Sequence, residues 1–411
     1  MKPLADAQRE ILTAMRRLPA ARVPLDEAGG LVLAEAVTAP HSVPPFANSA
    51  VDGYAVRAAD TAGAPVDLAV VEDIPAGSVP TRTVEAGTAA RIMTGASIPA
   101  GADAVVMVED TEPAAGGVRV AASVAAGDNV RPAGGDLEAG ETVFEPGDRI
   151  SPAHIGVLAS IGVAEPLVVR RPTVAVLSTG DELVPVGTAT LPPGVIRDSN
   201  GPMLVAMLRE LGVTVLDMGI VPDDEIRLRS SLAEAASGAD AVVTSGGVSM
   251  GEHDLVKKVL AELGSVDFWK VAMQPAKPFA FGFLDATPLF GLPGNPVSVI
   301  VAFEQFVRPA LLRRMGARRL FRPRGRAVAG EHLRTDREKT VFLRVVVRPG
   351  EAATGVFLAG GQGSNVLSAL AAADAFAVVP AGVDTVEIGE PVELEWFRAA
   401  ETRTMEEVLG E

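Results

Sequence analysis

The residues best suited to chemistry lie in four polar or glycine-rich segments, each of which directly follows a predicted strand. These segments are STGDE at 178–182, VPDD at 221–224, TSGGVSMG at 244–251 and GLPGN at 291–295. Ligands of doubly wound sheets bind beyond the carboxyl ends of the strands, so we expect the four segments to converge. Glycine lets the backbone approach a ligand closely, and the free N–H groups at a helix start favour an anion. The pattern predicts an anion site at one edge of a sheet.

The glycine-rich segment 244–251 does not match the known nucleotide-binding fingerprints. Gly246 and Gly251 have the four-residue gap of a P-loop, but Glu252 and His253 stand where Lys and Ser or Thr are required. The segment also lacks the G-x-G-x-x-G pattern of dinucleotide-binding folds. Taken alone, it is as compatible with a tight turn as with a binding site.

Acidic and basic side chains accompany these segments. Asp181, Asp223 and Asp224 follow predicted strands, and Lys270 and Lys277 lie between the third and fourth segments. Paired acids near lysines suit Mg²⁺ bound by carboxylates and substrate phosphates. The alternatives are that the aspartates cap helices and that the lysines are solvated surface residues.

Alternating strands and helices from Thr173 onward position the four segments. Apolar patterns predict strands at 174–177, 213–216 and 241–243, and helices at 202–211, 225–236 and 252–260. This alternation indicates a parallel sheet covered by helices. Further strands are expected at 266–271, 279–283 and 288–290, before a helix over 296–314 that Asn295 caps.

The remaining sequence indicates β-rich regions on both sides of this unit. Helical spacing predicts helices over 4–18, 25–37 and 151–161, and short Val-rich runs between 54 and 131 predict a small antiparallel barrel or sandwich. Alternating runs after residue 326 predict a final small β domain. We divide the chain into an elongated linker domain (1–40 and 137–170), a small β domain (41–136), an α/β domain (171–316) and a C-terminal β-barrel (317–411).

Composition limits the functional classes. The chain has 411 residues, of which 48% are hydrophobic, enough for several domain cores. It has zero cysteines and four scattered histidines, so any metal would be held by oxygen. A net charge of −16 argues against nucleic-acid binding. Apolar runs shorter than about 18 residues and an N-terminus without a signal-peptide core predict a cytoplasmic protein that does not span a membrane.

Seven motifs occur in order over nearly the whole chain: NSAVDGYA (48–55), RIMTGA (91–96), NVRPAGGD (129–136), STGDEL (178–183), SGGVSMGEHD (245–254), KPFAFG (277–282) and GLPGNPVS (291–298). In these motifs the chain resembles the MoeA-type molybdopterin molybdotransferases, which include the E domain of gephyrin. The resemblance implies a multidomain α/β plus β protein. Its parts would be a central doubly wound parallel-sheet domain of the MogA type, an N-terminal β-rich elongated region and a C-terminal small β-barrel.

The resemblance also implies the reaction and its participants. A homodimer would insert molybdenum from molybdate into adenylylated molybdopterin and release AMP, helped by Mg²⁺ or another divalent cation. Protein partners would be the molybdopterin adenylyltransferase and the molybdoenzymes that receive the cofactor.

The functional positions implied by the resemblance fall into three groups. Catalytic roles fall on Asp52, Glu182, Asp223, Asp254, Lys270 and Lys277. Substrate binding falls on Thr94, Arg131, Asp136, Ser245, Gly246, Gly247, Ser249, Gly251, Pro293, Gly294, Asn295, Ser298 and Ser364. The metal ligands would be Asp223, Asp254 and Glu182.

Two residues depart from the family pattern, and two other functions are alternatives to this assignment. Gln274 stands where many relatives have a second lysine, and Gly135 where an acid is common, which predicts a lower positive charge around molybdate. The alternative functions are molybdopterin adenylylation by ATP, which isolated domains like 173–315 perform, and a scaffold. The additional N- and C-terminal domains argue against the first alternative, and the retained polar motifs argue against the second.

Overall fold

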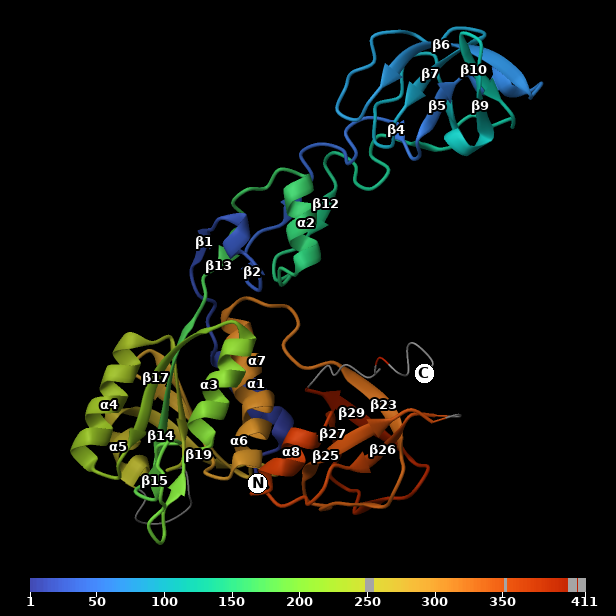
Figure 1. Ribbon diagram of the computed structural model, residues 1–411. Helices are drawn as coiled ribbons and strands as arrows, with labels where there is room; N and C mark the ends of the chain where they lie inside the picture. The colour runs from blue at the N-terminus through green and yellow to red at the C-terminus, as the bar shows by residue number, and fades with distance from the viewer. Residues whose placement is uncertain (248–254, 351–352, 398–404, 406–411) are drawn as a thin grey trace.

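The computed structural model describes residues 1–247, 255–350, 353–397 and 405, and shows an elongated chain. A β-rich lobe lies at one end, a slender linker domain follows, and the α/β domain and a C-terminal barrel lie side by side at the other end (Figure 1). None of the helices that the structure describes has the length and apolar composition needed to cross a membrane.

The N-terminal lobe is a six-stranded sheet of order β8-β5-β7-β6-β10-β9. Its strands are β5 (Gly53–Val56), β6 (Val66–Ile74), β7 (Thr88–Ile92), β8 (Ala104–Met107), β9 (Thr111–Ala114) and β10 (Gly117–Val120), with 3₁₀ turns at Ala58–Thr61 and Val108–Asp110. Separate apolar clusters form on the two faces of the sheet, because successive side chains of a strand alternate between faces. The prediction of a purely antiparallel domain is wrong at one place, since β6 and β7 run parallel.

The linker domain is built from short segments that are far apart in the sequence. Strand β13 (Leu167–Val169) pairs with β1 (Ala20–Arg22) and β2 (Val32–Leu33), while β3 (Val37–Thr38) pairs with β12 (Thr142–Phe144). Helix α2 (Pro152–Ser160) starts as predicted, with the Ser151 side chain accepting from the His154 N–H at 3.4 Å. At the base of the lobe β4 (Asn48–Ser49) pairs with β11 (Val130–Arg131). The chain therefore enters and leaves the lobe through two neighbouring strands.

The helix predicted over 25–37 is wrong. That stretch contains a 3₁₀ turn (Leu25–Glu27) followed by β2 and β3. Gly30 has a positive φ of 77°, a conformation that ends a right-handed helix and is favourable for glycine. The backbone conformation at Gly30 therefore prevents the helix that the spacing of the apolar residues predicted.

The α/β domain has a six-stranded sheet of order β17-β14-β18-β22-β21-β19. Its strands are β14 (Thr173–Thr179), β17 (Thr214–Val221), β18 (Ala241–Ser245), β19 (Gly264–Lys270), β21 (Pro278–Leu284) and β22 (Thr287–Leu292), with a small pair β15 (Leu183–Val184) and β16 (Ile196–Arg197). The first four strands in this order are parallel, as predicted, whereas β21 runs in the opposite direction and pairs antiparallel with both β22 and β19. A tight β21–β22 hairpin, with Asp285 at φ 52°, reverses the direction at this edge.

Helices cover both faces of this sheet. One face packs against α3 (Asn200–Leu211), α6 (Pro296–Ala302), α7 (Arg308–Arg314) and the N-terminal α1 (Leu4–Ala14), and the other against α4 (Glu225–Gly238) and α5 (Leu255–Leu263). Although we assigned residues 1–40 to the linker domain, α1 contributes Ala7 and Ile11 to the core of the α/β domain. The apolar side of α1 thus packs against the α/β domain and not, as its position in the sequence had suggested, against the linker domain.

The predicted helix over 296–314 is continuous but contains a π turn (Phe303–Val307) between α6 and α7. Pro309 has no N–H to donate to the Gln305 carbonyl, so the regular α-helical bond cannot form there. The freed Gln305 carbonyl instead accepts from Gln8 Nε2 at 3.3 Å. This hydrogen bond holds α1 against the π turn between α6 and α7.

The C-terminal barrel closes through the pairing of β25 with β27. Around it run β25 (Thr340–Arg348), β26 (Gly355–Leu358), β23 (Arg324–Ala329), β29 (Pro391–Trp396) and β27 (Ala375–Val379), with α8 (Leu367–Ala372) and the pair β24 (Leu333–Arg334) and β28 (Thr385–Val386) beside them. The α/β domain adds β20 (Met273–Gln274), which pairs in parallel with β25. The two domains are therefore joined by backbone hydrogen bonds as well as by the chain.

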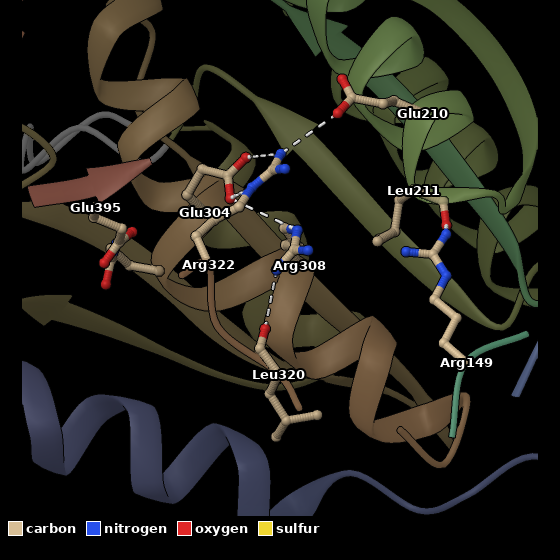
Figure 2. A network of polar contacts seen from close by, with 9 residues as sticks. Arg149, Glu210, Leu211, Glu304, Arg308, Leu320, Arg322 and Glu395 are labelled. Carbon is tan, nitrogen blue, oxygen red and sulfur yellow. Dashed lines mark hydrogen bonds and ion pairs between the residues drawn. The ribbon is translucent and has the colours of Figure 1, made fainter. Parts of the chain in front are cut away.

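A buried ion network also fixes the barrel segment against the α/β domain (Figure 2). Glu304, only 3% exposed, accepts two hydrogen bonds from Arg322, at 2.9 and 3.0 Å. It also lies 3.7 Å from Arg308, and Arg322 lies 3.6 Å from Glu210 of α3. Arg149 of the linker domain reaches the same region and donates to the Leu211 carbonyl at 2.8 Å. The α/β domain and the segment that leads into the barrel therefore meet at the Glu304 carboxylate, and the linker domain contacts the α/β domain nearby.

Replacing Glu304→Gln should lower the free energy of unfolding by about 3–5 kcal/mol, because removing one partner leaves buried arginines without a counterion. The exposed pair Asp67–Arg119 offers a control, and Asp67→Asn should cost about 1 kcal/mol or less. Urea unfolding can be followed by the fluorescence of Trp269 in the α/β domain and Trp396 in the barrel. Equal losses in the two variants would contradict the role given to Glu304.

Candidate functional site

The carboxyl ends of the central strands form a polar cavity of about 270 Å³, which we call the strand-end cavity. Three of the four predicted segments supply lining residues, among them Thr179, Glu182, Ser245, Gly246, Gly294 and Asn295. Parallel pairing of β14, β18 and β22 brings these segments to one edge of the sheet, as expected for a doubly wound fold. The predicted convergence of these three segments is thus observed.

Asn200, at the start of α3, connects two of these segments. Its side chain is 8% exposed, and Nδ2 donates to Ser245 Oγ at 2.9 Å and to the Gly294 carbonyl at 2.7 Å. Its Oδ1 is buried without a hydrogen-bond partner in the described part of the chain. A buried polar atom without a partner is costly, so Asn200 Oδ1 is suited to accept a hydrogen bond from a ligand.

The glycines of the third segment are required by the local packing, an explanation that the sequence could not distinguish from close approach to a ligand. Gly246 and Gly247 have φ of 89° and 66°. A Cβ on Gly246 would lie 2.5 Å from the Thr179 carbonyl oxygen, and one on Gly247 would lie 2.1 Å from a methyl of Val256. Both positions therefore require glycine for the local backbone and for packing, whether or not a ligand contacts them.

An acidic corner forms where β14 and β17 end. Asp181 Oδ1 accepts from the Asp223 N–H at 3.0 Å, so the two segments are in direct contact. Burial raises the pKa of Asp223, and the nearby charges of Asp181 and Glu182 raise it further. Of the predicted capping residues, Asp224 does cap α4, accepting from the Arg227 N–H at 2.9 Å, whereas the Asn295 side chain does not cap α6.

The structure describes only two of the three predicted metal ligands, Glu182 and Asp223. Within the described ranges, no group of three or more acidic or imidazole side chains is placed to hold a metal ion. Glu182 and Asp223 lie in the acidic corner, while Ser249, Gly251 and Asp254 fall outside the described residues. Mg²⁺ binds through one or two carboxylates together with waters and substrate phosphates, so the acidic corner has suitable donors.

A second cavity, of about 490 Å³, lies between the α/β domain and the barrel, and we call it the basic cavity. The α/β domain contributes Gln274, Lys277, Asn295 and Ser298, and the barrel contributes Arg334, Lys339, Arg344 and Ser364. The two domains also touch where the Val297 N–H donates to the Ser364 carbonyl at 3.1 Å. Asn295 lines both cavities, so they adjoin at this residue.

Arg344 is a buried cation without an acidic partner among the described residues. It is 1% exposed, and its Nη2 donates to the carbonyls of Gly361 and Gly363 at 2.7 and 3.1 Å. Its Nε has no hydrogen-bond partner in the described structure, and burial lowers the pKa of the guanidinium. Burying a charge without a counterion is unfavourable, so this residue makes the basic cavity suited to an anion.

Two other predicted residues of this region lie elsewhere. Lys270, the last residue of β19, is exposed and is not among the described residues that line either cavity. Pro293 is buried and is not among the described residues that line either cavity. Lys277, in contrast, lies at the basic cavity, after a turn in which Ala276 has a φ of 74° and is 3% exposed. An alanine held in this left-handed conformation fixes a strained backbone just before Lys277.

The remaining predicted residues gather at the base of the N-terminal lobe. Asp52 Oδ1 accepts from both the backbone N–H and the hydroxyl of Thr94, each at 2.7 Å, and these bonds lower the pKa of Asp52. Arg131 pairs with Asn48, and the Asp136 N–H donates to the Val43 carbonyl at 3.0 Å. The lobe lies at the other end of the molecule from the α/β domain and the barrel (Figure 1), whose residues line both cavities. A single chain does not bring the two groups together.

Sequence reasoning missed four residues that the structure places at the cavities: Asn200, Arg334, Lys339 and Arg344. The polar run DSN at 198–200, directly before an apolar helix, was a usable signal for Asn200. The three basic residues belong to the barrel, and nothing in their local pattern indicates that they face another domain. Only the pairing of β20 with β25 reveals this.

Three family models match consecutive parts of the chain. They are the MoeA N-terminal region (domain I and II) over residues 2–162, a probable molybdopterin binding domain over 175–313, and the MoeA C-terminal region (domain IV) over 326–397.

Individual relatives match over nearly the full length. Molybdopterin molybdenumtransferase 2 of Mycobacterium tuberculosis is 41% identical over 405 residues, covering 96% of this chain and 99% of that protein. The molybdopterin molybdenumtransferase of Haemophilus influenzae is 39% identical over 376 residues, covering 91% and 93%. The crystal structure of a molybdopterin biosynthesis moeA protein from Pyrococcus horikoshii OT3 matches with a TM-score of 0.82 at 29% identity, covering 97% of this chain and all of that one.

Proposed function

Because the chain belongs to the MoeA family of molybdopterin molybdenumtransferases and inserts molybdenum in molybdenum cofactor biosynthesis, we propose how its two cavities divide the reaction. The basic cavity binds molybdate, and the strand-end cavity binds the pterin of adenylylated molybdopterin. The single observation that carries this assignment is the buried Arg344 at the basic cavity, without an acidic partner in the described structure. The match over nearly the whole chain disfavours an isolated adenylyltransferase.

Molybdate is a tetrahedral dianion that needs cations and hydrogen-bond donors. The basic cavity offers the ammonium of Lys277 and the hydroxyls of Ser298 and Ser364. Charge-assisted hydrogen bonds of this kind are about twice as strong as neutral ones. None of the described residues that line this cavity is acidic, so an oxyanion meets no direct repulsion from its walls.

The strand-end cavity has a different character that suits a heterocyclic ring. Its lining includes the amides of Asn200, Asn295 and Asn365 and the hydroxyls of Thr179 and Ser245. Neutral donors and acceptors complement the ring nitrogens and carbonyl of a pterin, and the unpartnered Oδ1 of Asn200 can accept from a ring N–H. Since the cavities adjoin at Asn295, a pterin in the first would present its sulfur-bearing side chain toward molybdate in the second.

A divalent cation is proposed at the acidic corner, held by Asp223 and Glu182. When bound, Mg²⁺ would neutralise charge on the phosphate oxygens as AMP is released. The raised pKa of Asp223 indicates an unfavourable concentration of negative charge that a cation would relieve. The roles given by family resemblance to Lys270, Gly247, Pro293 and Asp254 stay predictions for the substrate-bound state.

We further propose that each active site is completed by a second subunit. Asp52, Thr94, Arg131 and Asp136 are exposed at the lobe and far from the cavities of their own chain (Figure 1). A two-fold dimer can place the lobe of one chain over the α/β domain of the other, and symmetry then forms two such sites. The Thr94 bonds to Asp52 keep this carboxylate ionised and oriented for that contact.

The acidic corner is tested with Asp223→Asn. Without metal, the variant should melt at a higher temperature than the wild type at neutral pH, because charge repulsion is removed. The raised pKa sets the sign: the wild-type penalty is full above the folded-state pKa and disappears as pH falls through it, so the two proteins should converge in acid. Added Mg²⁺ should stabilise the wild type and not the variant. Asp267→Asn, an exposed control in the same domain, should change neither property.

The oxyanion assignment is tested with Lys277→Ala and AMP release as the readout. The molybdate concentration for half-maximal AMP release should rise about tenfold or more, since a charged hydrogen bond is lost. The requirement for adenylylated molybdopterin should change much less. Lys258→Ala removes an exposed lysine that pairs with Glu225 and serves as the control. Equal changes in both substrate requirements would show that Lys277 is not specific for molybdate.

The shared site is tested by complementation between Asp52→Ala, which should be inactive, and Lys277→Ala, assayed at a molybdate concentration at which Lys277→Ala alone releases little AMP. Random re-dimerisation yields about half mixed dimers, in which one site carries both changes and the other carries none. About a quarter of the wild-type activity should return. A mixture that stays inactive after demonstrated subunit exchange means that both residues act within one chain.

A further inference from the structure

A third cavity lies where the linker domain meets the α/β domain, beside the Glu304 network of Figure 2, and we call it the arginine cavity. Its volume is about 40 Å³. Its charged lining residues are Arg149, Glu210, Arg308 and Arg322, and Met207 and Phe303 supply apolar wall. None of the described residues that line it also lines the strand-end cavity or the basic cavity. The arginine cavity is therefore a separate site that neither substrate assignment uses.

The charges at the arginine cavity are unbalanced. The buried carboxylate of Glu304 accepts two hydrogen bonds from Arg322 and lies 3.7 Å from Arg308. The side chain of Glu210 is 69% exposed, so solvent screens its attraction for Arg322. Arg149, Arg308 and Arg322 thus share two carboxylates, and one positive charge has no counterion in the described part of the chain. A largely buried charge without a counterion is unfavourable.

The pKa values of two of these arginines reflect their repulsion. Burial lowers the pKa of Arg308, whose side chain is 13% exposed, and the charges of Arg322 and Arg149 lower it further against the opposing effect of Glu304. Partial burial also lowers the pKa of Arg149, and the charges of Arg171 and Arg322 act in the same direction. The guanidinium groups therefore lie close enough to repel one another. An anion between them would relieve this repulsion.

Two of the guanidinium groups have N–H donors left for a ligand. Arg308 Nη1 donates to the Leu320 carbonyl at 3.1 Å. Arg149 donates through Nε to the Gly30 carbonyl at 3.0 Å and through Nη2 to the Leu211 carbonyl at 2.8 Å. Among the described residues, nothing accepts from Arg308 Nη2 or Arg149 Nη1. Figure 2 shows the guanidinium of Arg149 extending toward that of Arg308, so these donors face the same space.

The size of the cavity and the shape of its donors select the class of anion. One water molecule needs about 10–15 Å³ of such space. The 40 Å³ available therefore holds the few oxygen atoms of a small inorganic ion and excludes a nucleotide or a pterin. The planar fork of a guanidinium matches two oxygens of a phosphate-type anion, whereas a halide offers a single acceptor atom. Arg149 is partly exposed, which leaves the cavity an entrance from solvent.

We propose that the arginine cavity binds a tetrahedral oxyanion of the phosphate or sulfate type. Arg149 belongs to the linker domain, Arg308 to the α/β domain and Arg322 to the segment that leads into the barrel. One anion bonded to these side chains holds the three parts together. Because the linker domain carries the lobe, an occupied site stiffens the connection between the lobe and the α/β domain. The proposal does not depend on which of the other two cavities takes molybdate.

The first test builds the counterion into the protein. Met207→Glu places a carboxylate in the wall of the arginine cavity, so in sodium chloride this full-length variant should melt at a higher temperature than the wild type. Met207→Gln has nearly the same shape without the charge and should not be stabilised. At equal ionic strength, sodium phosphate or sodium sulfate should raise the melting temperature of the wild type and of Met207→Gln by about 2 °C or more, and that of Met207→Glu much less.

Two results of this test would overturn the proposal. One is that neither phosphate nor sulfate stabilises the wild type relative to chloride. The other is that Met207→Glu is no more stable than Met207→Gln and gains as much from the oxyanion. The salt that acts at the lower concentration identifies the preferred ion.

The second test locates the ion by calorimetric titration with sodium phosphate. Arg149→Gln should weaken phosphate binding about tenfold or more, the loss expected for a charged hydrogen bond. Arg318→Gln removes the same charge from the same domain boundary, where the side chain is 54% exposed and pairs with Asp148, and should change binding less than about twofold. Lys277→Ala should retain this binding. Loss of phosphate binding in Lys277→Ala but not in Arg149→Gln would place the ion in the basic cavity and refute the proposed site.

Discussion

The carboxylate of Glu304 is the buried charged contact that holds the segment leading into the barrel against the α/β domain. It is buried between Arg308 of its own helix and Arg322 of the segment that leads into the barrel, while Arg322 also approaches Glu210 (Figure 2). A buried charge network tolerates little displacement, because moving one partner leaves the others desolvated and unpaired. The π turn next to Pro309 places Glu304 and Gln305 in this region, so a local irregularity of one helix determines where the barrel docks.

The docking of the barrel on the α/β domain forms the basic cavity beside the strand-end cavity. The lining of the strand-end cavity includes amide and hydroxyl groups together with the charged Glu182, Arg197 and Asp198, whereas the basic cavity lies where the turn before Lys277 faces the barrel. Neutral groups select a ring by the positions of its donors and acceptors, while cations recognise an oxyanion by charge. Asn295 belongs to both linings, which makes it the point where the two kinds of recognition meet.

Much of this architecture could be predicted from local pattern, and the errors have physical reasons. Helix α2 was correctly predicted over 151–161, because its Ser151 cap and its apolar residues agree with its environment. The helix expected over 25–37 was excluded by Gly30, and the parallel sheet gained one reversed strand, β21, through the Asp285 turn. Lys339 and Arg344 could not be placed, since their importance comes from pairing between segments more than 60 residues apart, as between Gln274 and Val341. The separation of Asp52 from Lys277 is likewise a property of the tertiary fold.

The pairing of β20 with β25 has a consequence for the order in which the protein matures on the ribosome. Residues 273 and 274 leave the exit tunnel well before β25 has been translated, so the turn that ends at Lys277 has no sheet partner during this interval. Most of the strand-end cavity, in contrast, is encoded upstream of residue 297 and can fold earlier, as domains generally do during synthesis. A nascent chain would thus complete the wall for the organic ring first. The basic cavity, to which we assign molybdate, would close only after the barrel has emerged.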